Sequence, residues 1–232
     1  MPKRTQSKPE PPDPSPALEI LQFKIWLLGI SPMIWRRVQV PASMTLRELH
    51  GVIQVVMGWE GIHLFQFTLR ARRFSSLELA AQSPDVPLSE LSLRSGMRFG
   101  YEYDLNGAWK HEVRLESRHE ADPGRNYPIC LDGDGSCPPE DCGGVPGFQA
   151  RREAWTAPET SRDFAVLANF VDQLALKRST GASIGAEEVD QVREALERLE
   201  VRQRWQGKPF SRKDVNGRLR NAEYLDLMHQ QW

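Results

Sequence analysis

A strand and a helix follow one another in the stretch Met33–Gly58, MIWRRVQVPASMTLRELHGVIQVVMG, and this stretch decides the predicted fold. The helix begins with a capping box, in which the side chains of Thr45 and Glu48 can each accept the other residue's backbone N–H. Apolar residues then recur at helical spacing up to Gly58, so we predict a helix over residues 45–57. Before it, residues alternate as in a strand, and one face carries Ile34, Arg36, Val38 and Val40.

Strand patterns flank this helix on both sides. Residues 18–30 are largely apolar and predict a buried strand that forms a hairpin with residues 33–40. Residues 62–70 alternate between apolar and polar side chains, and so do residues 97–105 and 109–115. Asn106-Gly107 predicts a type I′ turn between the last two strands, because both positions tolerate a positive φ. Residues 116–149 are rich in Gly and Pro and are expected to form a loop.

The chain becomes helical after this loop. From Ser161 onward two apolar stripes appear, and a last short helix is expected between Val215 and Met228. The order predicts an α+β protein: a mixed β-sheet with a ββαβ, β-grasp-like core and a C-terminal helical segment. The stripes are Phe164, Leu167, Ala168, Val171 and Leu174, then Val189, Val192, Leu196 and Leu199.

The predicted organisation has three parts. Residues 1–17 are polar and rich in Pro, and we expect a disordered arm. Residues 18–150 would form the α+β domain, and residues 151–232 would form a helical extension packed on it. The chain of 232 residues has a net charge of −1, so it lacks the global basic field that would recruit nucleic acid or anionic membrane.

The compartment is predicted from two further features. No apolar run approaches the roughly 20 residues that span a bilayer, and the polar arm lacks the apolar core of a secretory signal. The chain has 3 Cys, an odd number that does not suggest a disulfide framework. We therefore expect a cytoplasmic protein with no membrane partner.

Three stretches resemble the plasmid pRiA ORF-3-like family. They are Leu21–Trp59, the pair Tyr101–Asp104 and Trp109–Val113, and Cys137–Gly144, which reads CPPEDCGG. The resemblance implies an α+β fold and an association with plasmids and mobile elements, where some members carry a resolvase-like label. It implies no established catalytic residues. The family's hairpin turn usually reads Asp-Phe-Gly-Asp, whereas residues 104–107 here read DLNG, so the second acid is absent.

Candidate chemistry lies on the strands and on the loop that follows them. His63 and Asp104 would converge if their strands are neighbours, and a His–Asp pair can orient an imidazole for acid–base work. A histidine on an apolar face is, however, more often a satisfied core residue. Loops held by a rigid sheet are where binding residues gather. The candidate binding surface comprises His63, Asp104, Trp109, His111, Glu140 and Asp141.

Two further sets of residues suggest cofactors or partners. His111, Cys130, Cys137 and Cys142 could hold zinc in a tetrahedral site. Their spacing is wider than that of a zinc knuckle, and free cysteines are often small buried hydrophobes. Residues 198–220 hold eight Lys or Arg and two acids, which suits nucleic acid or a solvated helical face. The candidate phosphate contacts are Arg202, Arg204, Lys208, Arg212 and Lys213.

These observations favour a non-enzymatic binding or interaction module, with a protein partner and a link to mobile DNA. Its recognition surface would combine the sheet face with the loop Cys137–Cys142. The alternative is a metal-dependent enzyme or nucleic-acid-processing protein built from His63, Asp104, His111 and the cysteine loop. His111 within reach of at least two cysteine sulfurs in an open pocket would favour the enzyme or metal interpretation, whereas separately buried cysteines would favour the interaction module. We also expect Cys137 and Cys142 to be structural, and Glu140 and Asp141 to be more dispensable for stability.

Overall fold

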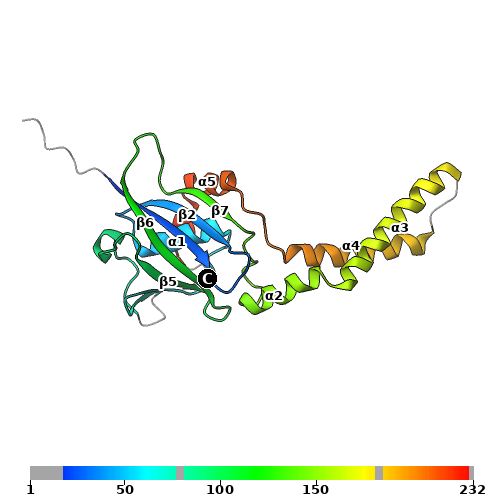
Figure 1. Ribbon diagram of the computed structural model, residues 1–232, viewed down its shortest axis with the longest axis horizontal. Helices are drawn as coiled ribbons and strands as arrows, with labels where there is room; N and C mark the ends of the chain where they lie inside the picture. The colour runs from blue at the N-terminus through cyan, green and yellow to red at the C-terminus, as the bar shows by residue number, and fades with distance from the viewer. Residues whose placement is uncertain (1–17, 77–80, 181–184, 230–232) are drawn as a thin grey trace, which may run out of the picture.

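The computed structural model describes residues 18–76, 81–180 and 185–229, in which one sheet is joined to a projecting pair of helices (Figure 1). The expected arm over residues 1–17 lies outside the described residues. The seven strands run in the order β4-β3-β5-β6-β1-β2-β7. They are β1 (Glu19–Leu27), β2 (Trp35–Pro41), β3 (Phe65–Leu69), β4 (Arg72–Ser75), β5 (Arg98–Tyr103), β6 (Trp109–Glu120) and β7 (Ile129–Asp134).

The α+β class is confirmed, but the expectation of a mixed sheet is wrong. Every pair of these named strands is antiparallel. The reason lies in β3, which follows the first helix. Instead of returning beside β1, β3 pairs with β4 and β5 on the other side of the sheet. The interior strand β1 therefore has antiparallel neighbours on both edges, β2 and β6.

Helix α1 (Leu46–Met57) forms as the capping box predicts. The Thr45 hydroxyl accepts the N–H of Glu48 at 3.1 Å, and the Glu48 carboxylate accepts the N–H of Thr45 at 2.7 Å. Gly58 ends the helix with a φ of 86°, in the left-handed region that favours glycine. The apolar side of α1 is buried together with the inward side chains of the strands, so the hydrophobic core lies between this helix and the sheet.

Two turns of the chain differ from the expectations. The strands β5 and β6 are joined by residues 104–108, with positive φ at Asp104 and Ala108, so the expected type I′ turn at Asn106-Gly107 is wrong. The Asp104 carboxylate accepts the N–H of Asn106 at 3.1 Å, which stabilises this wider turn. The loop expected over residues 116–149 instead holds the end of β6, the whole of β7 and the start of α2.

The later helices take two directions. Helices α3 and α4 extend away from the sheet, whereas α5 and α6 return to it (Figure 1). Asn216 on α5 pairs with both backbone groups of Cys130, and so covers the edge of β7. Gly51 on α1 lets α6 approach, because a Cβ there would collide with the Tyr224 carbonyl. The helices are α2 (Gly144–Trp155), α3 (Pro158–Thr180), α4 (Ala186–Arg204), α5 (Arg212–Arg220) and α6 (Glu223–Leu227), with a short 3-10 helix, η2, at Leu88–Leu91.

Candidate functional site

An aromatic cluster under the sheet positions the loop Cys137–Cys142. The rings of Trp59 and Tyr103 are stacked with centroids 5.2 Å apart, and Trp109 lies 5.7 Å from Trp59. Trp59 Nε1 donates to the carbonyl of Pro138 at 2.9 Å, and Trp109 Nε1 donates to the carbonyl of Glu140 at 3.0 Å. Both indoles are buried, so these bonds fix the loop backbone against the core.

Glu140 is also held by its side chain. Its carboxylate accepts the hydroxyl of Tyr103 and, at 2.8 Å, the backbone N–H of Glu60. Burial, with the neighbouring carboxylate, raises the pKa of Tyr103 well above its ordinary value, so this phenol stays protonated and donates. The geometry argues against the expectation that Glu140 is dispensable for stability, because the carboxylate joins the loop to β5 and to the segment after α1.

His63 lies between two carboxylates at the end of the sheet. Its Nε2 is 2.9 Å from Asp141 Oδ1, and its Nδ1 is 3.9 Å from Asp104 Oδ1. The Asp141 side chain is 69% exposed, and its bond to His63 does not join it to the core. The Glu140 side chain, by contrast, bonds to Tyr103 and to the backbone of Glu60. The structure thus brings His63, Asp104, Glu140 and Asp141 to one end of the sheet, with Trp109 beneath the loop.

His111 lies apart from that surface. It is 1% exposed, its Nδ1 is 3.0 Å from the Trp109 carbonyl, and the ring stands edge-on to Trp59. Burial lowers the pKa of His111 to about 3, so the imidazole is neutral at physiological pH. Of the six residues of the candidate binding surface, His111 and Trp109 therefore contribute to the core and not to a surface.

The cysteines do not form the expected zinc site with His111. Cys130, Cys137 and Cys142 are buried free thiols, and burial raises their pKa values to about 11, 12 and 11. Across residues 18–76, 81–180 and 185–229, no group of three or more His, Cys, Asp or Glu is placed to hold a metal ion. The topology explains why: β1 and β2 separate β6, which carries His111, from β7, which carries Cys130.

The basic residues of 198–220 also have separate roles. Arg202 pairs with Asp163, and Arg212 donates to the carbonyl of Leu131 at 3.1 Å. Arg204 and Lys208 line a cleft, and Lys213 is exposed on α5. These five side chains lie on two helices and the segment between them, and two of them already have partners. A common phosphate-binding surface stays a prediction.

The open face of the sheet satisfies most of its own charges. Trp26 and Trp35 are neighbours on β1 and β2, and a cation lies over each ring: Arg98 at 5.8 Å over Trp26 and Lys24 at 4.7 Å over Trp35. Ion pairs such as Arg98–Glu112 continue across this face. A cation therefore already lies over one face of each ring, and the role of the sheet face in a recognition surface stays a prediction.

A cleft of about 660 Å³ opens beside the loop. Its lining combines apolar residues, among them Trp59, Pro138 and Pro139, with charged ones. Sequence reasoning missed this cleft, because nothing in the sequence indicates that the end of α4 returns beside residues 137–140. Tyr103, which bonds to Glu140, was also missed as a site residue. The sequence could have indicated it, because Tyr103 lies in the stretch Tyr101–Asp104 that resembles the family. The charged lining residues are Glu60, Glu140, Glu200, Arg204 and Lys208.

We predict that Glu140 and its neighbour Asp141 differ in their effect on stability. Glu140→Ala removes the acceptor of a hydroxyl and an N–H, and is expected to lower the free energy of unfolding by about 2 kcal/mol. Asp141→Ala is expected to cost less than about 0.5 kcal/mol, because its bond to His63 is largely exposed. Urea denaturation of both variants measures the difference. Equal costs would contradict the division of roles.

Comparison with known proteins agrees with this fold. An uncharacterized protein, y4hQ, of Sinorhizobium fredii is 33% identical over 149 residues, which cover 62% of this chain and 76% of that protein. The crystal structure of a protein of unknown function, MM3350, from Methanosarcina mazei Go1 matches with a TM-score of 0.56 and 32% identity. That match covers 61% of this chain and 84% of the other.

Within the described ranges, no helix is both long and apolar enough to cross a membrane.

The family model described as plasmid pRiA4b ORF-3-like protein matches residues 19–173, well over half of the 232 residues. The sequence resemblance is thereby confirmed: this chain belongs to the plasmid pRiA4b ORF-3-like protein family.

Proposed function

We propose that the protein is a non-enzymatic binding module that receives a short segment of a partner protein in the cleft beside residues 137–140. The observation that carries this proposal is the cleft itself. It has room for a few side chains, and its lining combines apolar residues, among them Trp59 and the two prolines, with charged groups of both signs. Such concave sites with a few placed polar groups are the usual form of a binding pocket.

The chemistry of the surrounding groups favours binding over catalysis. The pKa values of the three thiols are raised by burial, so these groups are protonated and weak nucleophiles at neutral pH. His111 is buried and neutral, and the Glu140 carboxylate is engaged by Tyr103 and Glu60. A general base needs access to the proton that it abstracts, and neither group has it.

The charge of the cleft favours a peptide over a nucleic acid. Three glutamates share the lining with Arg204 and Lys208, so the lining carries both signs. A phosphate backbone would be repelled by the glutamates, and the tight binding of such backbones relies on several unopposed cations. A protein segment with an apolar side chain between charged ones complements this lining. The description of the family as plasmid proteins supports a link to mobile DNA.

A random twelve-residue peptide library tests the proposal. Selection on the full-length protein is expected to enrich peptides with an apolar residue flanked by charge, and fluorescence anisotropy then gives their Kd. Lys208→Glu is expected to weaken binding by at least about tenfold, since it reverses a charge in the cleft. Lys213→Glu is the matched control, because Lys213 is exposed on α5 outside the cleft.

Three outcomes would contradict the proposal. One is a selection that enriches no sequence, and another is a peptide whose affinity is unaffected by Lys208→Glu. The third comes from a labelled single-stranded or duplex oligonucleotide of about 20 nucleotides, titrated at low and moderate salt. If that probe binds with a steep salt dependence and Lys208→Glu abolishes the binding, the partner is a nucleic acid and not a protein segment.

A further inference from the structure

Four cations lie in one row across neighbouring strands of the sheet. In the strand register, Arg98 on β5 lies beside Arg114 on β6. Arg114 in turn lies beside Lys24 on β1, and Lys24 lies beside Arg37 on β2. Because neighbouring strands are about 4.8 Å apart, the row is about 14 Å long. We call these four residues the cation row.

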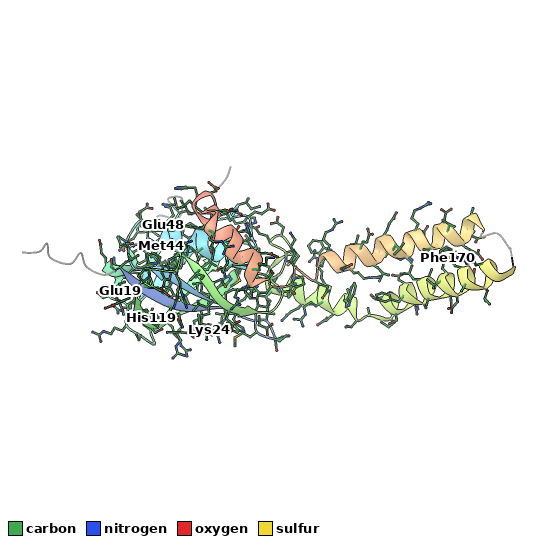
Figure 2. The ribbon with its side chains drawn as sticks, turned by 90° about the horizontal axis from the view of Figure 1, so that it is seen from above. Glu19, Lys24, Met44, Glu48, His119 and Phe170 are labelled. Atoms are coloured by element: carbon green, nitrogen blue, oxygen red, sulfur yellow. The ribbon has the colours of Figure 1, made fainter. Side chains whose placement is uncertain are left out.

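The cation row lies on the open face of the sheet, away from α1. Figure 2 shows Lys24 on the opposite side of the sheet from Met44 and Glu48, which lie at the start of α1 and just before it. The neighbours of Lys24 along β1, Phe23 and Ile25, are fully buried in the core. Since successive side chains of a strand point to opposite faces, the four cations all point away from the core.

A row of this kind is unfavourable to the fold by itself. Like charges directly opposite each other on neighbouring strands destabilise a sheet, and the cation row contains three such pairs. Local arrangements that cost stability are most often found at functional sites. An anionic partner laid across the four strands would offset the repulsion, so the row indicates a site for a line of negative charges.

Carboxylates of the open face neutralise only the two ends of the cation row. Glu112 pairs with Arg98 at 2.9 Å, and Glu116 pairs with Arg37 at 2.7 Å. Within residues 18–76, 81–180 and 185–229, the two middle cations form no ion pair with a carboxylate, and Arg114 is exposed. The excess positive charge of the row therefore lies at its centre.

Two tryptophans lie beside the cation row on the same face. Trp26 and Trp35 are register partners and are partly exposed, and each is two residues, or about 7 Å, from a member of the row on its own strand. Lys24 lies 4.7 Å from the Trp35 ring, and Arg98 lies 5.8 Å from the Trp26 ring. Cations beside flat aromatic rings are the combination that binds single-stranded nucleic acid, because the cations contact phosphates and the rings stack with bases.

The charges around the row favour a linear partner over a planar one. Arg73 on β4 continues the basic character of this face at one edge, whereas Asp132 and Asp134 on β7 make the other edge acidic. Lys110 and Glu102 pair with each other at 4.0 Å and add no net charge. An anionic membrane surface would press on the two aspartates, but a single strand can follow the row and leave them uncovered.

From these observations we infer that the open face binds single-stranded nucleic acid, with phosphates along the cation row and bases toward Trp26 and Trp35. For four contacted phosphates, the logarithm of the affinity is expected to fall against the logarithm of the salt concentration with a slope of about −3. No member of the row lines the cleft beside residues 137–140. This inference goes beyond the peptide site, so the two proposals can fail independently.

Fluorescence anisotropy of a labelled oligothymidylate of about 20 nucleotides, titrated with the full-length protein at about 50 mM and about 200 mM salt, tests the inference. Arg114→Glu and Lys24→Glu are each expected to weaken binding at least about tenfold, since a phosphate contact becomes a repulsion. Trp26→Leu is expected to weaken it at least about fivefold and to leave the salt slope unchanged. Lys213→Glu is the matched control, because it changes the net charge equally but lies exposed on α5, which packs with α1.

Thermal denaturation followed by circular dichroism separates a loss of binding from a loss of folding. Arg114→Glu is expected to keep or raise the melting temperature, because it removes two of the three like-charge contacts in the row. Arg114→Gln, which removes the charge without reversing it, is expected to weaken binding by a smaller factor. A stable Arg114→Glu variant that no longer binds, beside a Lys213→Glu variant that binds as the native protein does, would support the inference.

Several results would overturn it. One is no binding of the oligonucleotide at about 50 mM salt, and another is equal weakening by Arg114→Glu, Lys24→Glu and Lys213→Glu. Tighter binding of a duplex of the same length would exclude the single strand as the partner. Vesicles containing phosphatidylserine that bind in its place would indicate a membrane surface, and equal competition by poly-glutamate would indicate an acidic protein segment. Loss of binding in Lys208→Glu would place the nucleic acid in the cleft instead.

Discussion

Lowering the pH from about 7 to about 5 is expected to reduce the free energy of unfolding by about 4 kcal/mol. Two buried histidines are responsible. Burial lowers the pKa values of His50 and His111 from 6.5 to about 3 in the folded protein. His50 stacks on Phe65 with the ring centroids 3.8 Å apart, and its Nδ1 lies 2.7 Å from the hydroxyl of Tyr101.

The sign of this effect follows from the protonation of each state. Below pH 6.5 both histidines bind a proton in the unfolded chain, but in the folded chain they stay neutral until the pH nears 3. The unfolded state therefore binds more protons, and acid favours it. The contribution to stability is complete above the unfolded pKa and is lost as the pH falls from about 6.5 toward about 3, by about 1.4 kcal/mol per unit for each group.

Urea denaturation at several pH values measures this dependence. His111→Gln removes one of the two groups and is expected to halve the slope of the free energy against pH, even where the variant is less stable at every pH. His119→Gln is the control, because His119 is exposed near the end of β6. A slope that His111→Gln leaves unchanged would show that other groups cause the acid sensitivity.

The parts of the fold that could be predicted are those whose signals are local. The capping box at Thr45 and Glu48 lies within four residues, and α1 begins where it predicts. β7 could not be predicted, because its sequence, ICLDGD, does not alternate between apolar and polar residues. Its place is fixed instead by pairing with β2 and by Asn216, which comes from α5.

The candidate site shows the same limit. The sequence indicated the loop Cys137–Cys142 and the strand residue Trp109, and the structure brings them together. It could not indicate the bond from Trp59 to Pro138, which joins residues 79 positions apart. The zinc set was wrong because sequence spacing does not show which strands intervene. Contacts between distant segments depend on the strand order, and single-sequence patterns do not contain that order.

The second large effect is expected at Arg36, which the sequence placed on the core face of β2 without a role. The residue is 2% exposed, and its guanidinium donates to four backbone carbonyls. Two of them, Asp134 and Gly135, begin the segment that leads into the loop at Cys137. Burial lowers the pKa of Arg36, yet a guanidinium stays protonated in proteins. The ring of Phe210 lies 4.3 Å from this cation.

Arg36→Met is therefore expected to lower the free energy of unfolding by about 4 kcal/mol. Methionine fills much of the volume of the arginine side chain. The four carbonyls, however, belong to the backbone, so the substitution removes their donor and leaves the acceptors in place. The buried carbonyl of Val56 would lose its charged donor, and so would the three part-buried carbonyls of Trp35, Asp134 and Gly135. The cost therefore comes from the unsatisfied acceptors and from the lost contact with Phe210, rather than from a cavity.

Arg37, the next residue, supplies the matched control for this experiment. It lies on the open face of the sheet and pairs with Glu116 at 2.7 Å, with 29% of its side chain exposed. Arg37→Met is expected to cost less than about 1 kcal/mol in urea denaturation, because solvent replaces a surface ion pair at little cost. If the two substitutions cost the same, the four carbonyls must find other donors. Arg36 would then not be the link between β2, α1 and the segment leading into the loop.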